Sequence, residues 1–443
     1  MSAIALRLYS VLMWLGQPLL RRKLASRGQA EPGYLHGVEE RFGHYTQPAE
    51  SRSELVWVHA VSLGETRTAS LLLQGLREQQ PGIRILLTHG TATGRSEGAA
   101  LLQPGDVQVW QPWDSAGAVR RFMAHFQPRV GLLMETEIWP NLVAVAAERS
   151  VPLVLVNGRL SEKSLLQALR VAPLSMPAYG ALTAVYAQTD DDARRFRQAG
   201  AHVTGILGNL KFDATPDAAQ CARGTAWREM PTRPVLMFAS SREGEEALLL
   251  DAMKNTTLSN AADRPVLLVV PRHPQRFDEV AALAQSRGLT VSRRSAWIDG
   301  PAPDHEAMAA DVWLGDSLGE MALYYSLSEV ALLGGSFAPV GGQNLIEAAA
   351  CGCPVVMGPH TFNFADAAEL AESTGAAFRV GDMEAALQGA LQLVADPAAQ
   401  KRASRAGLAF AAHHRGATVR TVAALKVYLD RAAGSAQQPA VVR

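Results

Sequence analysis

The sequence contains little cysteine. Only three of its 443 residues are cysteines, Cys221, Cys351 and Cys353. That number gives no disulfide framework and is typical of a reducing compartment. Cys351 and Cys353 lack the further Cys or His partners that a zinc site requires, so we interpret them as small buried residues.

The sequence also lacks an excess of charge of either sign. Lys and Arg together number 42, Asp and Glu together number 42, and the formal net charge is zero. A protein that binds nucleic acid usually carries a basic excess. We therefore expect no nucleic-acid partner.

Long hydrophobic runs are scarce, and the one at the amino terminus is marginal for crossing a bilayer. "AIALRLYSVLMWLGQPLL" is interrupted by Arg7 and several small or polar residues, and a span needs about 20 apolar residues. No small-residue cleavage site follows it, which argues against a cleaved signal peptide. The basic cluster at 21–23 would keep the rest of the chain cytoplasmic. Residues 1–25 are thus predicted to be a membrane anchor or an interfacial helix, with a helix packed on the protein's own surface as the alternative.

The remainder of the chain alternates short apolar runs with helical stretches, which is typical of a doubly wound parallel sheet covered on both faces. The predicted strands in the first half are "LVWVHAV", "IRILLT", "VQVWQP", "RVGLLME", "VPLVLVN" and "LTAVYAQ". After a turn-rich stretch the pattern resumes with "PVLMFAS", "PVLLVV", "GLTVS", "ADVWLGD", "SEVALLGG" and "CPVVMG".

This pattern predicts two Rossmann-like domains, at 35–215 and 220–425, and a frayed tail at 432–443. A chain of 443 residues is long enough for two domains of ordinary size. Ligands of open α/β sheets bind at the carboxyl ends of the strands. We therefore expect the two domains to face each other across a cleft, lined by the residues that follow the strands.

The strongest motif in the second half is "SEVALLGGSFAPVGGQNLIEAAACGCPVVMGP". Gly341 and Gly342 lie in a loop before a predicted helix, where a backbone can approach a ligand closely and helix-start N–H groups attract phosphate. Asn344 and Glu347 are three residues apart and are predicted to share a helical face. Glu347 is suited to accept hydrogen bonds from a ribose.

Two further loops of the second half carry polar residues after predicted strands. "ASSREGEE" places Ser240 before a helix with acidic residues in its first turn, either as a helix cap or as part of an anion site. "PRHPQRF" places Arg272 and His273 after an apolar strand, where they are suited to phosphate, although a surface turn is an equal alternative.

The first half offers carboxylates in the same positions. Glu65 ends "WVHAVSLGE", and Glu135 and Glu137 begin "ETEIWPN". A carboxylate at a helix start is stabilised in its charged form, so we expect Glu65 to be ionised near neutral pH, as a base must be. Arg95 and Arg159, in two other loops of this half, are candidates for holding an acceptor that bears phosphates.

Asp190 and Asp192 have the D-x-D spacing by which some glycosyltransferases hold a metal. Thr189 precedes them and a helix follows, so helix capping explains these acids better. We therefore predict no catalytic metal.

Seven segments together resemble the signature segments of 3-deoxy-D-manno-oct-2-ulosonic acid (Kdo) transferases and occur in the order of that family. They are "WVHAVSLGE", "ETEIWPN", "NGRLS", "GNLKFD", "ASSREGEE", "PRHPQRF" and "GGSFAPVGGQNLIEA". The resemblance covers the chain from about Arg41 to Pro359. It implies the GT-B fold and a donor, CMP-Kdo, that glycosylates a lipid A precursor (lipid IVA) in lipopolysaccharide core biosynthesis. It also implies attachment to the cytoplasmic face of the bacterial inner membrane.

The resemblance also implies roles for individual residues. Glu65 corresponds to the catalytic base of the family and Glu135 to a second functionally important acid. The CMP of the donor would lie against a set of residues in the second half. That set is Ser240, Arg272, His273, Gly341, Gly342, Asn344 and Glu347.

The predicted reaction is an inverting displacement in which Glu65 takes the proton of an acceptor hydroxyl as CMP leaves. We expect it to need neither a metal nor a cofactor, because positive side chains and helix-start N–H groups would stabilise the departing phosphate. Two alternatives are a two-domain nucleotide-sugar epimerase or hydrolase, and a non-enzymatic carrier at the membrane. The first would need no lipid acceptor, and the second would show no turnover.

Overall fold

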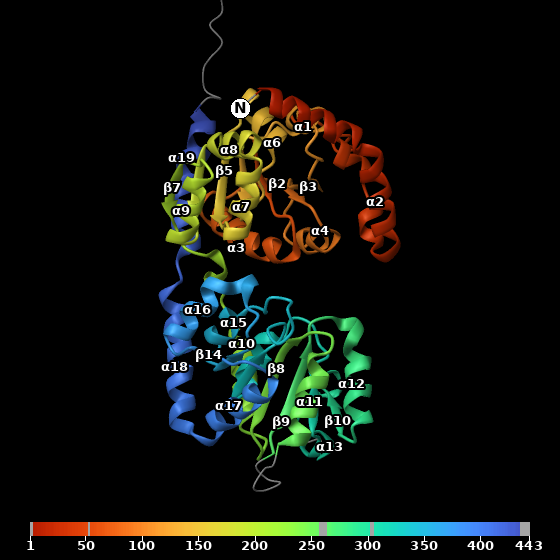
Figure 1. The fold of residues 1–443 in the computed structure, drawn as a ribbon, viewed down its shortest axis with the longest axis vertical. Helices are drawn as coiled ribbons and strands as arrows, with labels where there is room; N and C mark the ends of the chain where they lie inside the picture. Colours follow the sequence, from red (N-terminus) through yellow and green to blue (C-terminus); the bar gives the residue numbers. More distant parts are fainter. Residues whose placement is uncertain (1–2, 52–53, 257–263, 302–304, 435–443) are drawn as a thin grey trace, which may run out of the picture. The chain divides into compact units, whose positions relative to one another are not determined.

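The computed structural model describes residues 3–51, 54–256, 264–301 and 305–434. These residues form two compact units. The first comprises residues 1–213 and 415–443, and the second comprises residues 214–414 (Figure 1).

The first unit is built on a seven-stranded parallel sheet with the order β3-β2-β1-β4-β5-β6-β7. Its strands are β1 (Leu55–His59), β2 (Arg84–His89), β3 (Val107–Trp110), β4 (Val130–Met134), β5 (Leu153–Gly158), β6 (Ala184–Ala187) and β7 (Val203–Ile206). Its helices are α1 (Ala3–Leu15), α2 (Gln17–Ala30), α3 (Leu63–Gln79), α4 (Ala92–Ala99), α5 (Ala116–Phe126), α6 (Pro140–Glu148), α7 (Glu162–Arg170), α8 (Ala172–Gly180), α9 (Asp190–Gln198) and α19 (Ala417–Gly434).

Helices cover both faces of this sheet, as the apolar strands predict. Successive residues of β1 point to opposite sides, so Leu55 and Trp57 belong to one buried cluster while Val56 and Val58 belong to another. All of β1 is buried. The carboxyl ends of β1 and β4, which are hydrogen-bonded neighbours, therefore place their following loops side by side.

The second unit repeats this architecture, with the order β10-β11-β9-β8-β12-β13-β14, again all parallel. Its strands are β8 (Val235–Ser241), β9 (Val266–Pro271), β10 (Val291–Arg293), β11 (Val312–Leu314), β12 (Val330–Leu333), β13 (Val355–Met357) and β14 (Ala377–Arg379). Its helices are α10 (Ala218–Arg228), α11 (Glu245–Asn255), α12 (Phe277–Ser286), α13 (His305–Ala309), α14 (Met321–Leu327), α15 (Leu345–Ala350), α16 (Ala365–Ser373), α17 (Met383–Ala395) and α18 (Pro397–His413).

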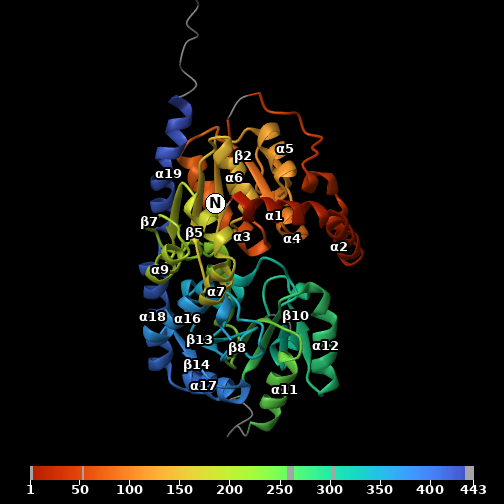
Figure 2. The ribbon, with the colours of Figure 1, turned by 45° about the horizontal axis from the view of Figure 1, so that its top comes forward.

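The last helix belongs to the first unit. The predicted second domain extended to residue 425, whereas the structure assigns the chain from Arg415 onward to the first unit. α19, drawn in blue, runs along that unit, and its Val422, Leu425 and Leu429 join the cluster that covers one face of the sheet (Figure 2). Burial of this apolar face decides the boundary. Most of the predicted frayed tail lies outside the described residues.

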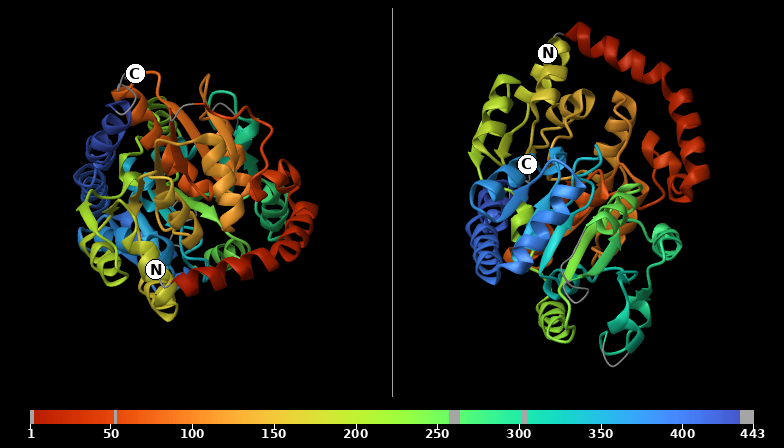
Figure 3. Two further views of the ribbon diagram at one scale, coloured as in Figure 1. Left: turned by 90° about the horizontal axis from the view of Figure 1, so that it is seen from above. Right: turned by 60° about the horizontal axis from the view of Figure 1, so that its bottom comes forward.

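α1 and α2 follow one another along the outside of the first unit, drawn in red in Figure 3. α1 contacts α6 and α8. In the part of the chain that the structure describes, no helix combines the length and the apolar content that crossing a bilayer requires.

Candidate active site

Glu65 is fixed by a reciprocal capping arrangement at the start of α3, just after β1. Its Oε1 accepts a hydrogen bond from Ser62 Oγ at 3.0 Å, and its Oε2 accepts one from the Val61 backbone N–H at 2.9 Å. The Ser62 hydroxyl in turn accepts from the Glu65 N–H. Such a capping box satisfies helix-start donors and holds the carboxyl in one orientation.

The surroundings of Glu65 raise its pKa to about 7. Burial is the largest cause, and the nearby charge of Glu135 adds to it. The hydrogen bonds from Val61 and Ser62 oppose the shift but are outweighed. At neutral pH Glu65 is therefore partly ionised and partly protonated, because burial and a like charge outweigh the helix start that was expected to favour the charged form. A carboxyl whose pKa is near 7 is well suited to accept a proton at neutral pH.

Glu135 follows β4 and lies close enough to Glu65 to affect its pKa. Its backbone is left-handed, with φ 58°, a conformation that is uncommon for residues other than glycine and often found at functional sites. Its carboxylate Oε1 is 2.9 Å from the Lys211 ammonium. The structure thus brings the two predicted acids together and adds Lys211, whose place in "GNLKFD" gave no indication of this ion pair.

Glu137 is a third member of this acidic cluster. Its Oε2 accepts a hydrogen bond from Trp139 Nε1 at 2.8 Å, and burial raises its pKa. Its charge also contributes to the raised pKa of Glu65. We call Glu65, Glu135 and Glu137 the acidic cluster.

Arg95, whose contact with an acceptor stays a prediction, makes an ion pair within the first unit. Its Nη1 is 2.9 Å from an oxygen of the buried Glu40, and its guanidinium lies over the ring of Trp110. This ion pair joins α4 to the segment before β1.

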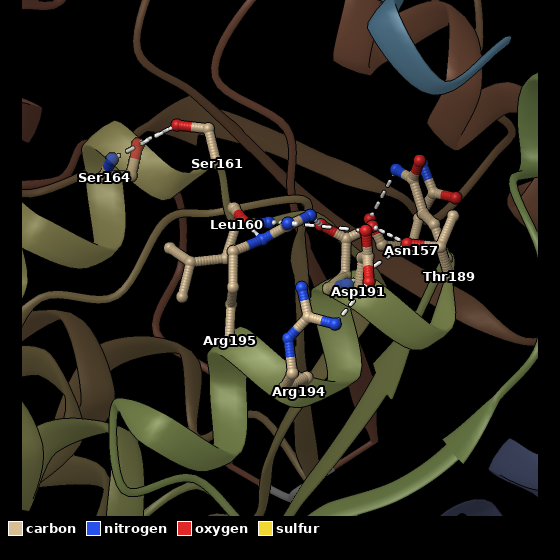
Figure 4. A network of polar contacts seen from close by, with 10 residues as sticks. Asn157, Leu160, Ser161, Ser164, Thr189, Asp191, Arg194 and Arg195 are labelled. Carbon is tan, nitrogen blue, oxygen red and sulfur yellow. Dashed lines mark hydrogen bonds and ion pairs between the residues drawn. The ribbon is translucent and has the colours of Figure 1, made fainter. Parts of the chain in front are cut away.

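Asp192 has the capping role that its position after Thr189 predicts. The Thr189 hydroxyl accepts from the Asp192 N–H at 3.1 Å, while Asp192 Oδ1 accepts from the Leu160 N–H at 2.9 Å. Figure 4 shows the surrounding network, in which Arg194 pairs with Asp191. Among the described residues, no three His, Cys, Asp or Glu side chains are grouped so as to hold a metal ion.

In the second unit, three of the predicted donor residues lie at the carboxyl ends of the adjacent strands β8 and β9, Ser240 within β8 and Arg272 and His273 just after β9. Ser240 has φ 56° at the end of β8, and the Arg272 N–H donates to the Ser241 carbonyl at 3.0 Å. His273 lies 2.9 Å, Nε2 to Nη1, from Arg242. Burial lowers the pKa of His273, and the neighbouring arginines lower it further, so its neutral ring accepts from Arg242.

Gly341 and Gly342 form a tight loop in left-handed conformations, with φ of 97° and 75°. A Cβ on Gly341 would lie 2.5 Å from the ring of Phe362, so this position requires glycine. The Gly342 N–H donates to the Gly335 carbonyl at 2.7 Å. The loop therefore folds back onto the end of β12.

Asn344 and Glu347 lie at the start of α15, which begins at Leu345. Asn344 is the N-cap, and its Oδ1 accepts from the Ile346 N–H at 3.1 Å. Glu347 lies in the first turn of the helix. The two residues share this turn, but only Glu347 is helical.

Sequence reasoning missed the role of Glu245. Its fully buried carboxylate accepts four backbone hydrogen bonds, of 2.7–3.1 Å, from the loop after β12 and from the loop before α11. The donors are the N–H groups of Gly335, Phe337, Ala338 and Arg242. The acids of "ASSREGEE" are therefore no sign of an anion site in that loop, because one of them occupies the N–H groups that an anion would use.

Comparison with known proteins identifies the family. Residues 36–214 match the family model of 3-deoxy-D-manno-octulosonic-acid transferase (kdotransferase). The chain is 48% identical to the 3-deoxy-D-manno-octulosonic acid transferase of Bordetella pertussis, over 96% of this chain and 98% of that protein. The chain belongs to the 3-deoxy-D-manno-octulosonic acid transferase family. The transferase of the same name from Haemophilus influenzae is 30% identical, over 96% of this chain and 98% of its own length.

Membership of the Kdo transferase family makes this chain a glycosyltransferase, so the epimerase, hydrolase and carrier alternatives are overturned. The two parallel-sheet units have the GT-B fold, as predicted. A solved structure of Staphylococcus aureus MnaA with UDP is similar in fold, with a TM-score of 0.57 at 16% identity. That similarity covers 85% of this chain and 97% of MnaA.

Proposed function

We propose that this Kdo transferase moves Kdo from CMP-Kdo to a lipid A precursor (lipid IVA) in lipopolysaccharide core biosynthesis, with Glu65 as general base. The observation that carries this proposal is the carboxyl of Glu65, oriented by its capping box and titrating at about pH 7. An acceptor hydroxyl loses its proton to Glu65 as its oxygen bonds to the anomeric carbon of Kdo. The bond from that carbon to the CMP phosphate breaks, and CMP leaves with the electron pair. Because the acceptor oxygen attacks from the side opposite CMP, the configuration of the anomeric carbon is inverted.

Glu135 acts on this base through its charge. By raising the pKa of Glu65, it makes the carboxylate a stronger base at the pH where both forms coexist. Its ion pair with Lys211 holds Glu135 itself in place. The strained backbone at Glu135 supports a functional role, since such strain is otherwise selected against.

The donor binds the second unit without a metal or a cofactor. Arg272 and Arg242 supply positive charge for the departing phosphate. The neutral ring of His273 accepts from Arg242 through Nε2 and offers its other nitrogen as a hydrogen-bond donor. Ser240 and the tight glycine loop allow close approach of the nucleotide. Glu347 accepts from the ribose and Asn344 orders the turn that carries it.

The enzyme works at the cytoplasmic face of the bacterial inner membrane, attached through α1. This helix turns polar groups toward the protein: Ser10 Oγ donates to Asn141 Oδ1 at 2.7 Å, and Tyr9 bonds Asp114. Its apolar residues face outward instead, with Ile4, Leu8, Leu12, Trp14 and Leu15 each 59–71% exposed. This polarity is the reverse of an ordinary surface helix and suits one that lies in a membrane interface.

The proposed reaction is tested by mass spectrometry of the lipid product after incubation with CMP-Kdo and lipid IVA. We expect Kdo-modified lipid, formed equally in excess EDTA. Glu65→Gln should bind CMP normally and lose transfer by about 10²-fold or more, because the neutral amide cannot take the proton. Near-normal turnover of Glu65→Gln would remove Glu65 as the base, and loss of activity in EDTA would contradict metal independence.

The proposed membrane attachment is tested with the double variant Leu8→Gln/Leu12→Gln. Loss of two outward apolar side chains should weaken sedimentation with anionic vesicles by roughly tenfold or more. Transfer to detergent-dispersed acceptor should stay unchanged. Val419→Gln on α19, where Val419 is 74% exposed, is the matched control. Unchanged vesicle binding of the double variant would show that α1 is not the attachment.

A further inference from the structure

The first unit contains an apolar cavity of about 330 Å³ beside the acidic cluster. Its walls come from α1, from the loop and first turn of α6, and from α7 and α8. The lining residues are Tyr9, Ile138, Trp139, Pro140, Gln167, Ala168, Val171, Leu174, Ser175, Ala178 and Tyr179. No local motif indicates this cavity, because its walls come from four separate helices.

Three polar side chains of this lining are hydrogen-bonded within the protein. The Trp139 indole N–H donates to Glu137, and the Ser175 hydroxyl donates to the Ala168 carbonyl at 2.6 Å. The Tyr9 hydroxyl bonds Asp114. With these groups satisfied, rings and hydrocarbon make up most of the lining, and the Gln167 amide and the Tyr179 hydroxyl are its remaining polar side-chain groups. Such a lining favours an apolar occupant over water or a sugar.

The position of the cavity connects two surfaces already described. On one side, Trp139 and Ile138 directly follow Glu137 in the chain, and Trp139 bonds its carboxylate. On the other side, Tyr9 belongs to α1, whose outer face is apolar. Exposed apolar side chains continue onto Leu166 of α7 and onto Val171, between α7 and α8, which are 53% and 52% exposed. The cavity thus lies between Glu137 of the acidic cluster and the proposed lipid-facing surface.

From this arrangement we infer that the cavity binds one fatty acyl chain of the lipid acceptor. The inference rests on the proposed function, since it specifies how the acceptor of that reaction is held. The hydrocarbon chain fills the cavity while the sugar to which it is attached lies toward the acidic cluster. Burial of the chain positions the acceptor hydroxyl and selects acceptors by the length of their acyl chains.

The first test fills the cavity with Ala168→Phe. The wild-type KM for the acceptor should rise roughly fourfold for each methylene removed from the acyl chains, as burial of a methylene predicts. In Ala168→Phe this dependence on chain length should be lost, and the KM for the full-length acceptor should rise about tenfold or more. The KM for CMP-Kdo should not change. Leu166→Phe, on the same helix but outside the lining, is the matched control and should behave as wild type.

The second test does not depend on turnover, so it separates this inference from the proposed function. Wild-type enzyme is irradiated with a photoreactive diazirine analogue of myristic acid, and the labelled peptides are mapped. We expect labelling within residues 138–140 and 167–179, competed by lipid IVA and abolished in Ala168→Phe with its thermal unfolding unchanged.

Three results would overturn the inference. One is the absence of label from these segments, and another is the same dependence on acyl length in Ala168→Phe as in wild type. The third is equal competition by a phospholipid of matched chain length, which would assign the cavity to a bilayer lipid. If wild type labels as expected but transfers no Kdo to any acceptor, the proposed function fails while the acyl site stands.

Discussion

Two opposing effects act on the carboxyl of Glu65. Hydrogen bonds from Val61 and Ser62 at the helix start favour its charged form, while burial and Glu135 favour its neutral form. The net result is a pKa raised from 4.5 to about 7. The same shift means that the folded state holds this proton more tightly than the unfolded state. Its contribution to stability is therefore fully present below pH 4.5 and is lost as the pH rises toward 7.

The pKa of Glu65 predicts the pH dependence of the reaction. Because the base must be unprotonated, kcat/KM should rise with pH and level off above about 7. In Glu135→Gln this rise should move to lower pH, since a like charge near Glu65 has been removed. Glu97→Gln, which alters a surface carboxyl paired with Arg67, is the control. A pH–rate profile of wild type and of Glu135→Gln measures the pH at which kcat/KM rises. If the rise stays near pH 7 in Glu135→Gln, the charge of Glu135 does not affect the pKa of Glu65.

At the scale of the element, the first residue of α11 holds the loop that follows β12. Glu245, the first residue of α11, collects N–H groups from the loop after β12 and from its own preceding turn. Charge-assisted hydrogen bonds to a buried carboxylate are among the stronger ones in proteins. The shape of the loop that leads to the Gly341–Gly342 turn therefore depends on one side chain about 90 residues earlier in the sequence.

Glu245→Gln should destabilise the enzyme by on the order of 3 kcal/mol, because the amide nitrogen would face backbone donors and leave buried N–H groups unpaired. The KM for CMP-Kdo should also rise, since the loop before Gly341 would lose its anchor. Urea unfolding and donor kinetics provide the measurements. Glu243→Gln, which changes an exposed acid of the same segment, should have little effect on either. Equal stability of the two variants would exclude the anchoring role.

At the scale of the whole molecule, the chain ends by returning to the unit where it began. Asp213 is the last residue of the first chain segment in this unit. Its carboxylate accepts hydrogen bonds from the N–H groups of Gly416 and Thr418 at the start of α19. Leu425 of that helix is fully buried against the core that contains Val56 and Val58. The first unit is therefore complete only after the second has been synthesised.

Because α19 packs on the first unit, a substitution in α19 should lower the stability of that unit and not that of the second. Leu425→Ala should destabilise the first unit by about 2–5 kcal/mol, the usual cost of a buried cavity. Hydrogen exchange should accelerate in α3 and β1, and stay unchanged in β8 and β9 of the second unit. Val427→Ala, two residues away and 44% exposed, should change stability by about 0.5 kcal/mol at most. Faster exchange in β8 and β9 would contradict the assignment of α19 to the first unit.

The local pattern was sufficient to predict most of the sheets. Strands such as β1 and β8 are continuous apolar runs between helical stretches, and each was predicted. β7 and β14 were not predicted. Both are edge strands: half of the residues of β7 are exposed, and only one of the three residues of β14 is buried, so neither produces a continuous apolar run.

The candidate site likewise contains residues that the sequence predicts and contacts that it does not. Glu65 and Glu135 could be predicted because each follows an apolar strand within a recognisable segment. The pairing of Glu135 with Lys211, the anchoring role of Glu245 and the ion pair of Arg95 could not be predicted. Each of these contacts joins residues more than 50 positions apart, and no local pattern encodes which distant partner a charged side chain meets.

The sequence by itself determined the two parallel sheets, the family and the acids at the strand ends, because apolar periodicity and ordered motifs are local properties. Only the tertiary structure decided the protonation of Glu65, the unit to which α19 belongs and the apolar cavity beside Glu137. These depend on burial, which arises when segments distant in sequence pack together.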